Sequence, residues 1–345
     1  MRDDAPEPPT PSAQPLPHGG DLGAADGLFG SPPQGWVDLS TGINPAPYPV
    51  GDIDAQAFYR LPEKSSIEDL LLAARDYYGA PDTDAIVCAP GTQALIQWLP
   101  RLRPRSRVVV ISPTYGEHAH AWGCAGHDVA EADSLEQVPD DTDVLIVVNP
   151  NNPDGMQYTH QELLDARRGL VRRGGWLIVD EAFADVTPDI SLAAHCVDDG
   201  LIILRSFGKF FGLAGLRLGF ALAHPAMAAR LTQALGPWSV GGPAIAIGAR
   251  ALRDTAWIHQ TRDTLRAGMQ RLELLLRGAG LDIVGTTDLY LLAQSDQAPQ
   301  LHVYLAQNGI WTRPFPNNPA WIRFGQPGAE DHWRRLETAF DLFLF

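Results

Sequence analysis

Residues 206–220 read SFGKFFGLAGLRLGF, and they place a single lysine, Lys209, among glycines and apolar side chains. Burial in such surroundings disfavours the charged ammonium and lowers its pKa, which frees the amine as a nucleophile. Lys209 is therefore a candidate for forming a Schiff base with an aldehyde.

Two further residues of this stretch suit a phosphate group. Ser206 supplies a hydroxyl three positions before the lysine, and Arg217 supplies a permanent cation eight positions after it. A cofactor that carries both an aldehyde and a phosphate needs this combination. The stretch therefore indicates pyridoxal 5′-phosphate (PLP).

The chain around this stretch alternates strand and helix patterns. The strands are continuous apolar runs, which is typical of strands covered on both faces. Helices between them complete βαβ units, so we predict an α/β fold with a mainly parallel central sheet flanked by helices. The expected strands are 85–89, 107–112, 143–149, 176–181 and 201–206, and the expected helices include 67–78 and 161–173.

The length of 345 residues favours two lobes after an irregular beginning. Residues 1–17 hold six prolines, so we expect residues 1–35 to form a flexible, Pro-rich segment. Residues 36–240 are expected to form a large cofactor-binding domain. Residues 241–345 are expected to form a smaller α+β domain with a long helical region over 244–278 and a final helix over 329–345.

Several polar residues fall in the loops that follow expected strands, where open α/β sheets bind ligands. Gly91, Thr92 and Gln93 stand at a strand-to-helix turn, which is either a phosphate site or an ordinary helix cap. Tyr115 is a candidate for stacking on the cofactor ring or for simple packing.

Asn152 and Asp180 are the next two candidates. Asn152 lies between prolines and either donates to a ring oxygen or belongs to a rigid turn. Asp180 ends an apolar strand, where an unpaired carboxylate is unfavourable. If the Asp180 carboxylate faced a pyridinium nitrogen, it would be paired and would keep that nitrogen protonated. The alternative is that Asp180 forms a salt bridge in the core or caps a helix.

The order of these features resembles the fold-type I PLP enzymes, and within them the histidinol-phosphate aminotransferase branch. A narrower resemblance is to the threonine-phosphate decarboxylases of cobalamin biosynthesis. It rests on His18-Gly19-Gly20, on the motif from Leu39 to Pro45, and on Phe183, which stands where aminotransferases usually carry a tyrosine. Two departures are Gly208, where many relatives have serine, and Leu61, where the aminotransferases have a tyrosine that reaches the neighbouring subunit.

The resemblance implies roles for the rest of the site. Lys209 and Asp180 would be catalytic, and Arg323 would bind the substrate carboxylate. Arg313, His18 and Asn44 are the further candidates for substrate binding. The implied reaction is decarboxylation of a small anionic amino-acid phosphate, L-threonine O-3-phosphate. The alternatives are a histidinol-phosphate aminotransferase and a non-catalytic partner module on a PLP fold.

Composition restricts the partners. A formal net charge of −15 argues against nucleic acid and anionic membranes, and no apolar run reaches transmembrane length. The three cysteines are far apart, so neither a metal site nor a disulfide framework is indicated. The N-terminus has no apolar signal region, so we expect a cytoplasmic protein. The resemblance also implies a homodimer.

Overall fold

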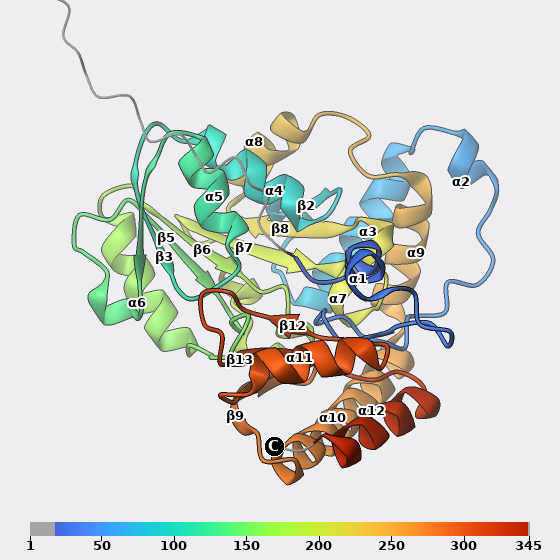
Figure 1. Cartoon of the computed structure of the whole chain (residues 1–345). Coiled ribbons are helices and arrows are strands. Elements are labelled where there is room, and N and C mark those ends of the chain that lie inside the picture. Colours follow the sequence, from blue (N-terminus) through green and yellow to red (C-terminus); the bar gives the residue numbers. More distant parts are fainter. Residues whose placement is uncertain (1–17, 344–345) are drawn as a thin grey trace, which may run out of the picture.

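The computed structural model describes residues 18–343, so the proline-rich stretch 1–17 lies outside the described residues. A seven-stranded sheet forms the centre of the larger lobe, in the order β2-β8-β7-β6-β5-β3-β4 (Figure 1). Its strands are β2 (Ile86–Ala89), β3 (Arg107–Ile111), β4 (Asp128–Ala132), β5 (Val144–Val148), β6 (Trp176–Asp180), β7 (Leu201–Ser206) and β8 (Gly219–Ala223).

The prediction of a mainly parallel sheet is confirmed. Strands β4, β3, β5, β6 and β7 run parallel to one another, whereas β8 is antiparallel to both β2 and β7. Sequence reasoning missed β4 and β8. The strand β8 continues the lysine stretch, so a tight turn brings that stretch back beside β7.

Alternate residues of each strand pack on opposite faces of the sheet, because side chains alternate along a strand. In β5, Leu145 and Val147 join one core, and Val144 and Ile146 join the other. The first core is covered by α3 (Lys64–Tyr78), α6 (His160–Val171) and α9 (Gly242–Arg253). The second is covered by α4 (Thr92–Trp98), α5 (Glu117–Cys124) and α8 (Pro225–Leu235).

A smaller antiparallel sheet lies below the large one in Figure 1, in the order β12-β13-β10-β9. Its strands are β9 (Asp282–Thr287), β10 (Tyr290–Gln294), β12 (Arg313–Pro314) and β13 (Trp321–Gly325), and its helices are α10 (Thr255–Gly278), α11 (Ala298–Gln307) and α12 (Glu330–Leu342). The expected helical region 244–278 is thus two helices. They separate at Asp254, whose Oδ1 caps α10 by accepting the Trp257 N–H at 3.0 Å.

The beginning of the described chain joins this smaller lobe. Strand β1 (Val37–Asp38) pairs in parallel with β11 (Ile310–Trp311), and Val37 and Leu39 belong to the core of the smaller lobe. The segment that was expected to be flexible, 1–35, contains a helix, α1 (Leu22–Phe29), which Asp21 caps.

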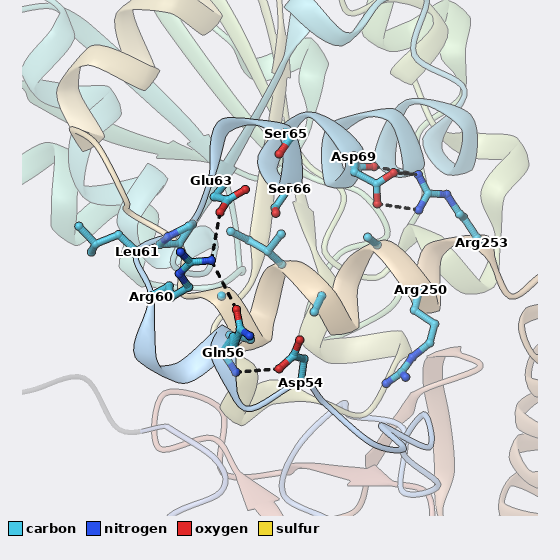
Figure 2. Close-up of a pocket in the computed structure, with 16 residues that line it drawn as sticks. Asp54, Gln56, Arg60, Leu61, Glu63, Ser65, Ser66, Asp69, Arg250 and Arg253 are labelled. Atoms are coloured by element: carbon cyan, nitrogen blue, oxygen red, sulfur yellow. Dashed lines mark hydrogen bonds and ion pairs between the residues drawn. The ribbon is translucent and has the colours of Figure 1, made fainter.

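An open groove lies between α3, α9 and the short helix α2 (Gln56–Tyr59). Figure 2 shows the charged side chains along it, including the ion pair of Arg253 with Asp69 at 2.7 Å. Apolar side chains close by are strongly exposed, among them Phe58, Tyr59 and Leu61.

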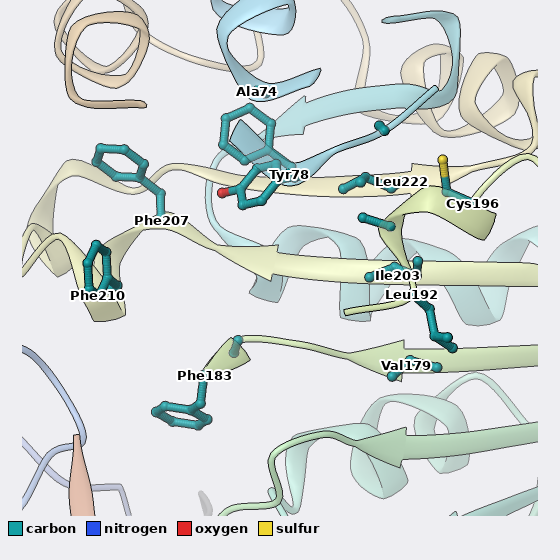
Figure 3. Packing of buried hydrophobic residues seen from close by; sticks show 14 of the residues in the cluster. Ala74, Tyr78, Val179, Phe183, Leu192, Cys196, Ile203, Phe207, Phe210 and Leu222 are labelled. Carbon is teal, nitrogen blue, oxygen red and sulfur yellow. The ribbon is translucent and has the colours of Figure 1, made fainter. Parts of the chain in front are cut away.

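Aromatic side chains pack beneath the turn that carries Lys209. Phe207, Phe210 and Phe211 are fully buried, and the Phe207 and Phe211 rings stack with centroids 4.4 Å apart. Figure 3 shows Phe207 and Phe210 at the end of β7, with Phe183 at the end of β6. This packing fixes the turn from below. Within residues 18–343, no helix is long and apolar enough to cross a membrane.

Candidate active site

A cavity opens where the parallel strands β5, β6 and β7 end, and all of the predicted cofactor residues line it. Its lining includes Gly91, Thr92, Gln93, Tyr115, Asn152, Asp180, Phe183, Ser206, Lys209 and Arg217. These residues come from six separate segments of the sequence. Only the sheet brings them together.

Lys209 lies on the single helical turn α7 (Phe207–Phe210), directly after β7. Burial lowers the pKa of its amine to about 8; the cations Arg323 and Arg217 add to this effect, and Asp180 opposes it. The Nζ atom lies 5.5 Å from the centre of the Phe183 ring. A buried amine with a lowered pKa fits covalent attachment to an aldehyde.

Asp180 ends β6 with its side chain buried. Its Oδ1 accepts the Ala182 N–H at 3.0 Å, and its Oδ2 lies 2.8 Å from His118 Nε2. His118 is buried on α5 and was missed by sequence reasoning, because 62 residues separate the pair and no local pattern connects them. The histidine orients the carboxylate toward the cavity.

At the opposite end of the cavity, backbone segments from different parts of the chain lie very close together. Gly91 has a φ of +81°, and a Cβ there would lie 2.7 Å from Arg217 Nη2. A Cβ on Gly219 would lie 2.6 Å from the Thr92 nitrogen. With Ser206 and Thr92 in the same wall, the guanidinium, two hydroxyls and the first amides of α4 form a cradle that suits a phosphate.

The resemblance to the family implies a serine at position 208, where this chain has glycine, and the structure gives a reason. A Cβ on Gly208 would lie 2.7 Å from the Cα of Ala214, on the facing side of the turn. The backbone of the turn therefore closes too tightly for a side chain at position 208. The phosphate cradle has one hydroxyl fewer as a result.

Arg323 forms the floor on the substrate side. It lies on β13, is 7% exposed, and donates through Nη2 to the Ser40 carbonyl at 2.9 Å and through Nη1 to Asn152 Oδ1. Its Nε is buried without a hydrogen-bond partner, and burial lowers its pKa to about 10. No carboxylate pairs with Arg323 within residues 18–343. A buried cation without a counter-ion is a fitting anchor for an anion.

A second, more open cavity adjoins the first and shares Lys209, Tyr115, Asn152 and Phe183 with it. Arg323 and Arg313 line it, and so does His18, which lies 3.0 Å from Glu117 Oε1. The structure therefore brings three of the four predicted substrate residues to one side of Lys209.

Asn44 is the exception. Its amide group donates to the Phe210 carbonyl at 2.9 Å, and its Oδ1 accepts the Ala46 N–H at 2.9 Å. Its own N–H donates to the Lys209 carbonyl. The side chain is thus turned toward the lysine turn and lines neither of the two cavities.

Tyr290 was also missed by sequence reasoning. Its ring packs edge-on against Phe183 with centroids 4.9 Å apart, and its hydroxyl donates to the Asn151 carbonyl. A Cβ on Gly42 would lie 2.6 Å from the Tyr290 ring, so this glycine is required for the close approach. No group of three or more His, Cys, Asp or Glu residues suited to a metal exists in the described part of the chain.

These arrangements define the class of protein. The family model for class I and II aminotransferases matches residues 54–332. A histidinol-phosphate aminotransferase from Sinorhizobium meliloti, solved with pyridoxal 5′-phosphate, has a TM-score of 0.81 at 20% identity, covering 98% of this chain and 97% of that chain. The chain belongs to the class I and II aminotransferase family, with pyridoxal 5′-phosphate as cofactor.

Within the family, the similarity to one group is much higher. A threonine-phosphate decarboxylase from Pseudomonas aeruginosa is 49% identical over 326 residues, which is 94% of this chain and 97% of that protein. Another from a Sinorhizobium species is 42% identical over 328 residues, again 94% and 97%. The narrower resemblance seen in the sequence is confirmed, and the chain is an enzyme rather than a non-catalytic module.

Proposed function

We propose that this protein decarboxylates L-threonine O-3-phosphate to CO₂ and (R)-1-amino-2-propanol O-2-phosphate, which supplies a linker for cobalamin. The observation that carries the proposal is Arg323, a buried cation beside Lys209 that has no carboxylate partner among residues 18–343. Arg313 and His18 line the same cavity and offer a second site for an anion. A substrate with both a carboxylate and a phosphate matches the two.

The cofactor fits the cavity at both ends, with Asp180 at one and the cradle of Arg217, Ser206 and Thr92 at the other. When bound, PLP supplies the electron sink that takes up the electron pair released as a bond to the substrate's Cα breaks. Lys209 would hold the cofactor, and its amine would move a proton at that Cα. Asp180 would keep the pyridine nitrogen protonated.

Substrate orientation selects the reaction. Arg323 binds the carboxylate through its planar fork, while Arg313 and His18 bind the phosphate. Holding both anions restricts rotation about the Cα–N bond, so that the carboxylate leaves rather than the hydrogen. A proton then takes the place of CO₂ on Cα.

The test is to incubate the holoenzyme with threonine phosphate and measure CO₂. A parallel incubation with histidinol phosphate and 2-oxoglutarate measures glutamate formation. We expect CO₂ release with threonine phosphate and no glutamate above background. Glutamate formation without CO₂ would instead establish the aminotransferase alternative.

We also propose a homodimer in which a second copy covers the groove between α2, α3 and α9. Phe58 and Leu61 are 64% and 63% exposed at its edge, and exposed apolar clusters of this kind mark interfaces. Tyr59, 82% exposed, would supply the neighbouring subunit with the hydroxyl that Leu61 lacks. A twofold dimer is the commonest assembly of soluble proteins.

The cytoplasm is the proposed location. Cys88, Cys124 and Cys196 are all free thiols, and Cys124 is exposed. Exposed free thiols persist in a reducing compartment. The two-lobe division at about residue 240 is likewise proposed, with residues 36–39 added to the smaller lobe because of their strand pairing.

A further inference from the structure

The three residues His18, Gly19 and Gly20, here called the N-terminal strap, lie tightly against the loop that follows β1. The Gly20 N–H donates to Ser40 Oγ at 2.7 Å. Ser40 is itself fixed, since its N–H and its Oγ donate to Asp38 Oδ1 at 2.8 and 2.6 Å. A Cβ on Gly19 would lie 2.2 Å from the Ser40 carbonyl oxygen, so the strap passes too close for any other residue there.

This anchorage connects the strap with the substrate floor. The Ser40 carbonyl that the strap covers is also the acceptor for Arg323 Nη2 at 2.9 Å. Both proposed anion-binding elements, the strap and Arg323, therefore rest on Ser40. The backbone of the strap is fixed at Gly20, but the His18 side chain needs a separate contact to keep its direction.

Glu117 provides that contact. It is the first residue of α5, and its side chain is 13% exposed. One carboxylate oxygen, Oε1, lies 3.0 Å from His18 Nε2, and the other, Oε2, accepts the Gln93 amide N–H at 2.7 Å. Gln93 lines the cofactor cavity, whereas Glu117 lines neither cavity. One carboxylate thus links the strap to the cofactor wall without facing the substrate.

We propose that Glu117 is a positioning residue for substrate phosphate: anchored by Gln93, it directs His18 over the second cavity. With Nε2–H donating to Glu117, the His18 Nδ1 forms no other hydrogen bond within residues 18–343. In the imidazolium form both ring nitrogens carry a proton, so Nδ1–H is the donor left for the phosphate. The inference rests on the proposed function in taking a phosphate as the group that His18 meets.

The experiment is a double-mutant cycle with Glu117→Ala, His18→Ala and the double variant, using CO₂ release from threonine phosphate and from threonine. Losing one charge-assisted hydrogen bond predicts a KM for threonine phosphate raised about tenfold in Glu117→Ala, with kcat changed less than about threefold. The KM for threonine should stay unchanged. In the His18→Ala background, the added loss should fall below about twofold.

Two further variants, a conservative substitution and a control, complete the double-mutant cycle. Glu117→Gln keeps hydrogen-bonding capacity at the same distance and should recover part of the affinity. Glu131→Ala removes an exposed carboxylate on β4 and should change nothing. An undiminished effect of Glu117→Ala in the His18→Ala background, or equal losses with both substrates, would overturn the proposal.

Binding of inorganic phosphate separates this inference from the proposed reaction. Titrating the holoenzyme's cofactor absorbance with inorganic phosphate requires no turnover. We expect Glu117→Ala to weaken phosphate binding about fivefold or more only while His18 is present. If the unmodified enzyme released no CO₂ but Glu117→Ala still weakened phosphate binding only in the presence of His18, the proposed reaction would be wrong and the role of Glu117 would stand. If Glu117→Ala bound inorganic phosphate as tightly as the unmodified enzyme, the proposed role of Glu117 would be wrong.

Discussion

Lys209 sits in the folded protein with a pKa of about 8, below the value of 10.5 for a solvated lysine. Below pH 8 the amine is protonated in both the folded and the unfolded protein. The folded, cofactor-free protein therefore bears the full free-energy penalty of burying a charge. Between pH 8 and 10.5 the unfolded chain binds more protons, and stability rises with pH. The penalty is about 3 kcal/mol at most.

Replacing Lys209 by Met should therefore stabilise the cofactor-free protein. We expect its free energy of unfolding to exceed that of the unmodified protein by about 2–3 kcal/mol at pH 7.5, a difference that shrinks as the pH approaches 10.5. Urea denaturation at a series of pH values measures it. A difference that did not vary with pH would show that the amine is not the cause.

Substitutions of Arg323 test whether this residue binds the substrate carboxylate. Arg323→Ala should lower kcat/KM for threonine phosphate at least tenfold, because a desolvated charge pair contributes about 2–5 kcal/mol. Arg323→Lys keeps the charge but loses the planar fork, so it should recover only part of the loss. Arg277→Ala, on the exposed end of α10, is the matched control. Equal activity of Arg323→Ala and the control would remove Arg323 from the site.

At the scale of the element, the turn from Phe207 to Gly219 tolerates side chains very unevenly. A Cβ on Gly208 meets the Cα of Ala214 at 2.7 Å, whereas a Cβ on Gly215 meets nothing within 4 Å. Gly208→Ala should lower the free energy of unfolding by about 1–3 kcal/mol through overpacking, and it should weaken cofactor retention.

Gly215→Ala in the same turn is the control and should leave stability within about 0.5 kcal/mol of the unmodified protein. Thermal unfolding and the release of cofactor on dialysis measure the two effects. If both substitutions were equally harmless, the turn would be looser than the structure indicates.

The elements that sequence predicted correctly are those with strong local patterns. The apolar runs of β3, β5, β6 and β7 and the lysine stretch defined the sheet, the cofactor and most of its contacts. Strand β4 reads DVAEA, and three of its five side chains are exposed, so it has no continuous apolar run. Its place comes from pairing with β3.

The site residues that the sequence did not reveal were missed for a different reason. His118 and Glu117 belong to a short helix, and their partners Asp180 and His18 lie 62 and 99 positions away. Nothing in a local window signals such contacts, because they arise only when the sheet and the strap are assembled. Asn44 shows the converse: its motif was recognised, but the structure uses its side chain to support the lysine turn.

For the whole molecule, the groove between α2, α3 and α9 shown in Figure 2 predicts that the protein forms a dimer. Leu61→Asp should shift the protein from dimer to monomer in sedimentation at micromolar concentration, since it places a charge in the proposed interface. Leu274→Asp is the matched control, because Leu274 is 73% exposed on α10, away from the groove. A monomeric unmodified protein with full activity would contradict the dimer.

The pairing of β1 with β11 has a consequence for biosynthesis. Residues 37–38 leave the ribosome long before their partner strand at 310–311 and before Arg323, which binds the Ser40 carbonyl on the substrate side of the site. The cofactor wall between residues 86 and 223 can assemble first, with its lysine pocket still uncovered on the substrate side. The nascent enzyme is therefore able to capture its cofactor before it is able to recognise its substrate.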